Sequence, residues 1–171
     1  RINKCERIKI DINNKNELLE KLDFLKIDLV VIGPEIPLAN GLADLLRKKD
    51  FKVFGPNKDG AKLEFSKSWA KEFMQKANIP TANFWKVNSI EEAKKIINSS
   101  SIPLVVKADG LASGKGVFIP NSTDECLKAA ESIFNGKFGN SGNIVVLEEK
   151  IQGPEVSVFA LCDGERYTLL P

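Results

Sequence analysis

A stretch of small residues between two apolar segments constrains the fold of this chain more than any other feature. Residues 102–107 and 117–120 have the apolar, β-branched character of strands, and residues 108–116 between them contain three glycines. A strand, a glycine-rich connection and a second strand predict a β-hairpin with the connection as its tip. Part of the chain is therefore expected to form an antiparallel sheet.

The hairpin tip carries residue types that bind phosphate. Glycines let backbone N–H groups converge on phosphate oxygens without obstruction by a Cβ atom, and lysines supply the opposite charge. The candidate residues are Lys107, Gly110, Ser113, Gly114, Lys115 and Gly116. The spacing differs from a Walker A loop, because a glycine and a strand follow the GxxxGK pattern where Ser or Thr and a helix are required. A flexible turn without a ligand is the alternative interpretation.

Composition excludes several classes of function. The 25 basic and 23 acidic residues give a net charge of +2 without a long basic run, so nucleic acid is not an expected partner. No apolar stretch approaches the roughly 20 residues that span a bilayer, and we expect a cytoplasmic chain without membrane contact. The three cysteines lack the spacing of a disulfide framework or zinc site, and the absence of histidine excludes a His base. Chemistry is left to lysines, carboxylates and the backbone.

The first 56 residues alternate between helical and strand patterns. Leucines at helical spacing predict helices around Leu18–Leu25 and Leu38–Leu46, and short β-branched segments at 28–32 and 51–54 predict strands. Such alternation indicates βα units around a parallel sheet, which binds ligands beyond the carboxyl ends of its strands. The candidate substrate-binding residues at the first such end are Gly33, Pro34 and Glu35. A tight turn without a ligand is the alternative.

In the rest of the chain strands follow strands, which indicates an antiparallel, α+β arrangement. Helices are expected to begin at Ser66 and at the capping boxes Ser89–Glu92 and Ser122–Glu125. The first of them is expected to bury Trp69, Ala70, Phe73, Met74 and Ala77. Further strands are expected at 84–87, 144–147, 155–160 and 166–170, with a two-residue turn at Asp163-Gly164.

Charged residues outside the hairpin complete the candidate site. Glu148 and Glu149 end one strand and Glu155 begins the next, so a nucleotide across the break could meet carboxylates and the backbone near Ile151. A charged sheet edge that opposes aggregation is the alternative. Lys67 follows a helix N-cap, where the helix dipole disfavours positive charge, and a bound anion would explain its position. A solvated surface lysine is the alternative there.

In their order along the chain, these residues resemble the phosphoribosylamine-glycine ligase (glycinamide ribonucleotide synthetase) family of the ATP-grasp class. The resemblance rests on residues 31–38, 53–56, 63–74, 79–82, 107–117 and 148–157, together with Gly41. It implies an ATP-grasp fold, α/β and α+β, in which a Rossmann-like parallel-sheet piece precedes an antiparallel ATP-binding lobe. The implied division is 1–65 for the C-terminal part of the substrate domain, 66–84 for a helix and linker, 85–155 for the lid subdomain and 156–171 for the start of the remaining core.

The resemblance also implies roles for individual residues. Lys67 and Lys107 would contact the phosphates of ATP, and the glycine loop would close over them. Glu148 and the backbone near Ile151 would hold adenine, and Glu155 would bind the ribose. The turn after the first strand would face phosphoribosylamine.

The implied reaction joins glycine to 5-phosphoribosylamine in de novo purine biosynthesis. ATP would phosphorylate the glycine carboxylate, and the amine would then displace phosphate to give glycinamide ribonucleotide. Because phosphoryl transfer depends on positioning and charge neutralisation, no covalent catalytic residue is assigned. The family's Gly-Arg-Glu-His turn and its Mg²⁺ (or Mn²⁺) ligands, a Glu and an Asn, have no counterpart here. We therefore expect a partial chain whose metal ligands lie outside it.

Two other functions stay open at the level of sequence. Another ATP-grasp enzyme, such as a sister carboxylate-amine ligase or a carboxylase subunit, would keep the lysines and Glu155. It would lack the Gly33-Pro34-Glu35 turn and the sequence Lys107-Ala-Asp-Gly110. A nucleotide-binding module without turnover would keep the loop and lack the metal ligands.

Overall fold

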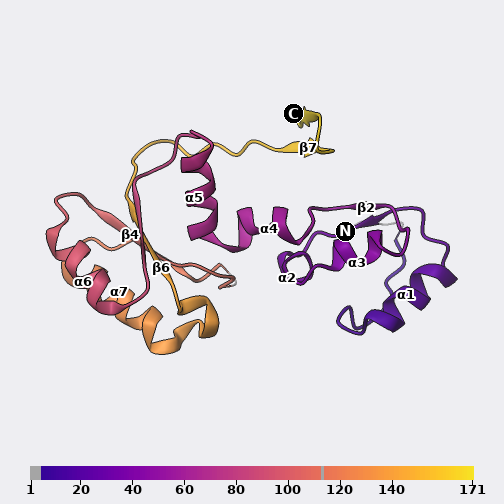
Figure 1. Ribbon diagram of the computed structural model, residues 1–171, viewed down its shortest axis with the longest axis horizontal. Coiled ribbons are helices and arrows are strands. Elements are labelled where there is room, and N and C mark those ends of the chain that lie inside the picture. The colour runs from indigo at the N-terminus through magenta and orange to yellow at the C-terminus, as the bar shows by residue number, and fades with distance from the viewer. Residues whose placement is uncertain (1–4, 113) are drawn as a thin grey trace.

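The computed structural model describes residues 5–112 and 114–171, which form two lobes connected by a pair of helices (Figure 1). The N-terminal lobe contains α1 (Lys15–Phe24), β1 (Val30–Val31), α2 (Glu35–Ala39), α3 (Leu42–Arg47) and β2 (Val53–Phe54). The connecting helices are α4 (Lys58–Phe65) and α5 (Lys67–Lys76). The second lobe contains β3 (Phe84–Val87), α6 (Ile90–Ser99), β4 (Leu104–Ala108), β5 (Val117–Phe118), α7 (Thr123–Ser132) and β6 (Val145–Glu149). A hairpin of β7 (Ala160–Cys162) and β8 (Tyr167–Leu169) follows.

The N-terminal lobe is built on a short parallel strand pair. Strands β1 and β2 align Val30 with Val53, which confirms the parallel arrangement that the alternating pattern predicted. The buried core of this lobe consists of Ile32, Leu42, Ala43 and Leu46. Because the two strands are very short and the core is small, few buried contacts support the residues that follow β1.

Two helices of the N-terminal half differ from the sequence-based expectation. The leucine stripe of 38–46 predicted one helix, but Gly41 adopts a left-handed conformation (φ 75°) and divides it into α2 and α3. Helix α4 was not predicted, because Gly60 and several charged residues interrupt its apolar pattern. Its N-cap is Asn57, whose side chain accepts a hydrogen bond from the Gly60 N–H (2.7 Å).

The second lobe centres on a four-stranded antiparallel sheet with the order β3-β6-β4-β5. Strands β4 and β5 form the predicted hairpin, with Lys107 paired to Val117. Strand β6 lies between β3 and β4 and aligns Glu148 with Phe84 on one side and with Val105 on the other. The glycine loop therefore projects from one end of the sheet, beside the edge strand β5.

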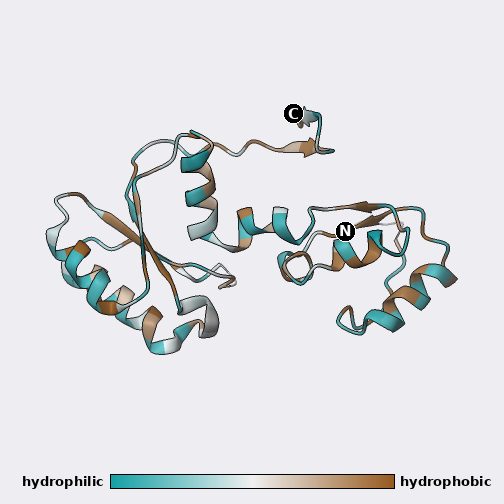
Figure 2. Ribbon diagram, in the orientation of Figure 1, coloured by the Kyte–Doolittle hydropathy of each residue, from teal (hydrophilic) through white to brown (hydrophobic). Residues whose placement is uncertain are grey.

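One face of this sheet packs on α6 and α7 and forms the larger core. The residues at its centre are Val87, Val106, Val145 and Leu147, all 1% exposed or less. Figure 2 shows the strands as mainly hydrophobic and the covering helices as mixed in character. Both helices begin as predicted, at Ser89 and Ser122. The glutamate of each capping box accepts a hydrogen bond from the N–H of the residue just before the serine.

Helix α5 begins at the predicted N-cap, since the Ser66 hydroxyl accepts a hydrogen bond from the Trp69 N–H. The expectation that its apolar side chains are buried was partly wrong. Phe73 is 41% exposed and stacks on the half-buried Trp69, whereas the buried residues of the helix are Ser68, Ala70 and Lys71. The polar side of α5 faces inward because it contacts charged groups of the sheet.

The segment after β6 also differs from the expectation. Residues 155–158 do not pair as a strand; they run exposed past α5 to the β7–β8 hairpin (Figure 1), which the Phe159 carbonyl joins by accepting from the Leu170 N–H (2.9 Å). The turn of this hairpin is centred one residue later than predicted, because the Asp163 N–H donates to the Arg166 carbonyl. The Asp163 carboxylate holds the turn by accepting from the N–H groups of Glu165 and Arg166. None of the helices in the described part of the chain has the length and apolar character needed to cross a bilayer.

Candidate functional site

Three charged side chains meet on the sheet face opposite the large core. The Glu148 carboxylate accepts from Lys107 Nζ with one oxygen (2.5 Å) and from Lys71 Nζ with the other (2.6 Å). Lys71 also donates to the Thr81 hydroxyl (2.7 Å). Glu148 and Lys71 are each 9% exposed, so this carboxylate and its lysine lie largely out of water.

The register of the sheet explains why Lys107 and Glu148 meet. Glu148 pairs with Val105, and Lys107 pairs with Val146. The two charged residues are thus diagonal neighbours on one face, within reach of a long side chain. Lys71 comes from α5, which covers part of that face. Lys107 and Glu148 were both predicted site residues, but Lys71 was not.

Opposing effects act on the Glu148 carboxyl. Burial raises its pKa, but the hydrogen bonds and charges of Lys107 and Lys71 more than offset this and hold the pKa below its ordinary value. Glu148 is therefore an anion at neutral pH. Together, the two ammonium groups and the one carboxylate carry a net positive charge.

A second carboxylate joins the glycine loop to the start of α5. Asp109 accepts from the Ser68 N–H (2.5 Å) and from the Ser66 hydroxyl (3.1 Å), so it caps the helix from another part of the chain. The N–H of Lys67 donates to the Asp109 carbonyl (3.2 Å), and Lys67 Nζ lies 3.3 Å from the Gly110 carbonyl oxygen. These contacts bring the predicted residue Lys67 to the base of the glycine loop.

The environment of Lys67 suits an anion. Burial lowers its pKa, and the charge of Lys107 acts in the same direction, while Asp109, Glu64 and Glu35 oppose them. The net result is a pKa below the ordinary lysine value. An anionic ligand between Lys67 and Lys107 would relieve both the desolvation and the mutual repulsion of the two ammonium groups.

The base of the glycine loop is fastened to a neighbouring turn. After α7 the chain forms a π-helical turn, Ile133–Lys137, and a 3₁₀ turn, Gly139–Gly142. Ser141 of that turn donates its hydroxyl to the Leu111 carbonyl (2.8 Å), and a Cβ on Gly110 would lie only 2.7 Å from the Ser141 hydroxyl.

The tip of the loop is more open. Gly114 has a left-handed backbone (φ 76°), and no described residue beyond its chain neighbours lies within 4 Å of a Cβ built on it; Lys115 is exposed. Gly116 returns to the strand, where a Cβ would lie 2.6 Å from the Ala112 Cβ. Ser113, the remaining predicted loop residue, lies outside the described residues.

The other predicted nucleotide contacts lie at and beyond the end of β6. Glu149 accepts from the Asn83 side chain (2.9 Å), and the Glu149 N–H donates to the Asn83 carbonyl. Ile151 (68% exposed) and Glu155 lie in the extended segment that leaves the sheet. In the described part of the chain the Glu155 carboxylate has no hydrogen bond or ion pair.

The predicted substrate residues Gly33, Pro34 and Glu35 follow β1 and open α2. All three are exposed, and Pro34 and Glu35 line a groove of about 630 Å³ between the start of α1 and α2. Glu35 acts on the pKa of Lys67, as described above, so the two predicted regions are in electrostatic contact. The turn therefore lies within electrostatic range of the base of the glycine loop.

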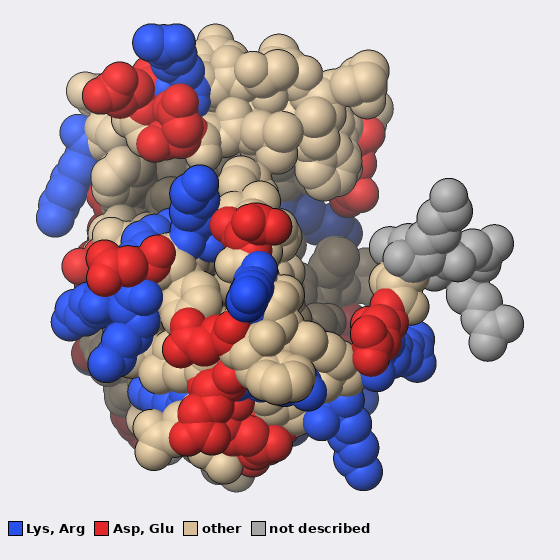
Figure 3. All heavy atoms as spheres, turned by 90° about the vertical axis from the view of Figure 1, so that its right-hand side faces the viewer, with Lys and Arg blue, Asp and Glu red and all other residues tan. Residues whose placement is uncertain are grey.

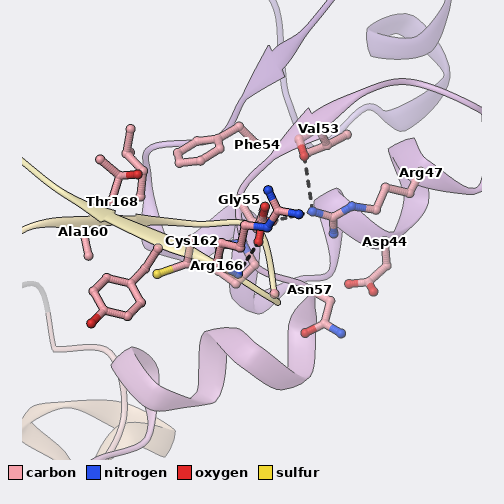
Figure 4. Close-up of a pocket in the computed structure, with 15 residues that line it drawn as sticks. Asp44, Arg47, Val53, Phe54, Gly55, Asn57, Ala160, Cys162, Arg166 and Thr168 are labelled. Carbon is pink, nitrogen blue, oxygen red and sulfur yellow. Dashed lines mark hydrogen bonds between the residues drawn. The ribbon is translucent and has the colours of Figure 1, made fainter.

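A larger groove lies between the N-terminal lobe and the β7–β8 hairpin (Figure 4). Arg47 lies at its wall and donates to the carbonyls of Val53 (3.3 Å) and Gly55 (2.5 Å). Arg166 of the hairpin points toward Arg47 (Figure 4).

Figure 3 shows basic and acidic side chains interspersed over the face on the N-terminal side of the molecule.

Lys71 and Asp109 are the site residues that the sequence reasoning missed. A signal for Lys71 was present, since it lies one helical turn after Lys67 on a helix whose polar side is buried. Asp109 stands between Lys107 and Gly110, which were both assigned to the loop, and aspartate is a common helix-capping residue. The helix that it caps is distant in sequence, because Ser68 and Asp109 are 41 positions apart.

Comparisons with known proteins match the whole chain to one family in two parts. A family model described as "Phosphoribosylglycinamide synthetase, N domain" matches residues 1–64. The model described as "Phosphoribosylglycinamide synthetase, ATP-grasp (A) domain" matches residues 65–171. The change from one match to the other falls at the end of α4.

Individual relatives agree with these matches. The phosphoribosylamine–glycine ligase of Mesorhizobium japonicum is 44% identical over 98% of this chain and 39% of its own length. The enzyme of that name from Nostoc is 43% identical over 94% of this chain and 38% of its own length. A crystal structure of the Thermotoga maritima phosphoribosylamine–glycine ligase superposes with a TM-score of 0.73 and 36% identity, over 89% of this chain and 37% of that one. The chain thus spans about two fifths of the length of these relatives.

Proposed function

This chain belongs to the phosphoribosylglycinamide synthetase family, and from that premise we propose that it supplies the ATP-phosphate site of a ligase that joins glycine to 5-phosphoribosylamine. One observation carries the proposal. Lys67 from the start of α5 and Lys107 from the end of β4 both lie at the base of the glycine loop, Lys67 beside the Gly110 carbonyl oxygen and Lys107 paired with Glu148. Their positive charge and the glycine-rich backbone of the loop suit a triphosphate.

In the proposed reaction a glycine carboxylate oxygen attacks the γ-phosphorus of ATP. The bond between that phosphorus and the β-γ bridging oxygen breaks, ADP leaves, and glycyl phosphate is formed. The amine of phosphoribosylamine then attacks the acyl carbon, loses a proton and displaces phosphate. The products are glycinamide ribonucleotide, ADP and phosphate.

The residues of this chain contribute positioning and charge to that reaction. The ammonium groups of Lys107 and Lys67 would balance the negative charge of the phosphates, and the loop of residues 110–116 would cover them and exclude water. The backbone near Ile151 would read the adenine at the end of β6, beside Glu148 and Glu149, and Glu155 would accept hydrogen bonds from the ribose.

Phosphoribosylamine is proposed to approach the turn of Gly33, Pro34 and Glu35. The exposed position of this turn at the carboxyl end of β1 supports that assignment. We place the reaction in the cytoplasm. Magnesium would neutralise phosphate charge when bound, but within residues 5–112 and 114–171 no cluster of three or more His, Cys, Asp or Glu side chains is suited to hold a metal ion. No residue of this chain is therefore assigned to magnesium.

A second function is favoured for the chain by itself. The chain spans about two fifths of its relatives' length, and in this second proposal it would bind nucleotide through these residues without turnover. Nucleotide binding and ligation are therefore tested separately.

Calorimetric titration of the chain with the magnesium complex of a non-hydrolysable ATP analogue tests the binding site. Saturable binding below millimolar concentration is expected, and no heat at millimolar analogue would contradict it. For ligation, release of ADP by the complete gene product should require glycine and phosphoribosylamine together. ADP release at a comparable rate without glycine would rule out the ligase function.

A further inference from the structure

Lys71 is a buried lysine to which neither the proposed reaction nor the sequence pattern assigns a role. Its side chain lies between α5 and the sheet and is 11% exposed. Its ammonium group donates to the Thr81 hydroxyl and to one oxygen of Glu148. A lysine is rarely buried without a paired group, because its charge is costly to remove from water.

The partner of Lys71 is shared with a proposed phosphate-binding residue. The second oxygen of Glu148 accepts from Lys107, which is 24% exposed at its side chain and stands at the start of the glycine loop. Lys71 therefore competes with Lys107 for the same negative charge. Because Coulomb energies add pair by pair, the charge of Lys71 repels Lys107 and offsets part of the attraction that Glu148 exerts on it.

We propose that Lys71 is a positioning residue for nucleotide binding: by sharing Glu148, it leaves the Lys107 ammonium oriented by the carboxylate but not neutralised by it. The proposal rests on the proposed ATP site and adds a residue that need not touch the nucleotide. Without Lys71, Glu148 pairs with Lys107 alone, and the pair presents no net charge to a triphosphate.

A purely structural role would predict something different. Lys71 also ties α5 to the sheet, and its loss could simply loosen that contact. The chain offers a matched comparison, since Lys86 of β3 forms an ion pair with Glu72 of α5 (2.9 Å) and ties the same helix to the same sheet without contacting Glu148. Lys86→Met therefore controls for the loss of a helix–sheet ion pair.

The experiment compares the unaltered chain with Lys71→Met, Lys71→Arg, Lys86→Met and the double variant Lys71→Met/Glu148→Gln. Two probes are titrated by calorimetry, the magnesium complex of a non-hydrolysable ATP analogue and magnesium tripolyphosphate. Tripolyphosphate has no adenine and isolates the phosphate contacts from any contact of Glu148 with the base. Thermal unfolding of each variant checks that it is folded.

We expect Lys71→Met to weaken the binding of both probes by about tenfold or more, since an interaction with a charged group has roughly this magnitude. Lys71→Arg and Lys86→Met should stay within about threefold of the unaltered chain. The double variant should recover most of the affinity for tripolyphosphate, because removal of the Glu148 charge releases Lys107. A structural role cannot produce this recovery.

Two results would overturn the inference while leaving the proposed function intact. One is unchanged affinity in a folded Lys71→Met variant, and the other is a double variant that binds tripolyphosphate no better than Lys71→Met. If the unaltered chain binds neither probe, the proposed function itself fails. Should Lys71→Met not fold, the rate at which an amine-acylating reagent labels Lys107, followed by mass spectrometry, replaces it. Labelling should be faster in Glu148→Gln, which removes the carboxylate charge, and also faster in Thr81→Val, which leaves Lys71 to draw Glu148 away from Lys107. Equal labelling rates would refute the proposal.

Discussion

The two lobes hold their candidate binding residues in different ways. In the sheet lobe, Lys107 and Glu148 stand on strands whose other face is fully buried, and each has a defined partner. In the N-terminal lobe, Gly33, Pro34 and Glu35 follow a strand of two residues and are exposed to solvent. One lobe presents fixed charges on a rigid sheet, and the other presents an open turn.

This difference fits the chemistry proposed for each lobe. Stabilising charge on a transferring phosphoryl group requires groups that are already in place, because their reorganisation would cost free energy during the reaction. A turn that meets a substrate with backbone and one carboxylate needs less support. The lobes should therefore respond differently to substitution, and this can be tested.

The largest effect is expected at Lys107. In the complete gene product, Lys107→Ala should lower turnover by roughly a hundredfold or more, as does removal of one preorganised group that stabilises developing charge. Initial rates of ADP release measure the effect. Lys94→Ala, an exposed lysine of α6 on the other side of the sheet, serves as the control. A loss of less than threefold at Lys107 would remove it from the phosphate site.

The next effect concerns the separate cores of the two lobes. Leu147 and Leu46 are both fully buried, and replacement of either with alanine should cost about 2–5 kcal/mol in the free energy of unfolding. Trp85 packs against the sheet-lobe core, so tryptophan fluorescence should report the loss in Leu147→Ala. Leu46→Ala should instead shift the urea transition seen by circular dichroism. Identical shifts in both probes for both variants would show that the lobes unfold as one unit.

A third effect depends on pH. Because the pKa of Glu148 is lowered in the folded chain, its stabilising contribution is complete above the ordinary value of about 4.5 and is lost as the pH falls through the lower folded value. Glu148→Gln should lower the free energy of unfolding by about 1–3 kcal/mol at neutral pH. It should also reduce the loss of stability between neutral and acid pH. Urea unfolding at pH values from 7 to 3 measures this dependence, and Glu91→Gln, at an exposed position of α6, serves as the control. If the free energy of unfolding of Glu148→Gln falls with pH as steeply as that of the unaltered chain, other carboxylates cause the acid destabilisation.

A comparable or smaller effect is expected at the base of the glycine loop. A Cβ at position 110 would lie 2.7 Å from the Ser141 hydroxyl and 3.1 Å from its Cα, so Gly110→Ala should cost about 1–3 kcal/mol through this overlap. Thermal unfolding measures the cost. The double variant with Ser141→Gly should recover part of it, and no recovery would mean that the loop and the turn are not in contact.

The smallest effect on stability is expected at Gly33. Among the described residues, apart from the two chain neighbours, no atom lies within 4 Å of a Cβ built there, so Gly33→Ala should change the free energy of unfolding by less than about 0.5 kcal/mol. If the turn meets phosphoribosylamine, the same variant should raise the KM for that substrate and leave the KM for ATP unchanged. Unchanged kinetics for both would leave the turn with a structural role only.

Local features of the sequence determined much of this fold. Ser66, Ser89 and Ser122 begin helices where they were expected, because an N-cap depends on a hydrogen bond to a residue only three positions away. The strand pattern around the glycine loop likewise predicted the β4–β5 hairpin. The local signal was weaker where glycine interrupts a pattern, as in α4, and at residues 155–158, whose two valines favour a strand that does not form.

Only the tertiary structure decided which charges meet. Lys71 and Glu148 are 77 positions apart, and their contact depends on the register of β6 against β4 and on the placement of α5 over the sheet. Asp109 caps a helix that begins 41 to 43 positions earlier, and Ser141 fastens a loop 30 positions before it. Sequence supplies residue types and local hydrogen bonds, but the partner of a buried charge is fixed by packing, because burial makes an unpaired charge too costly to keep.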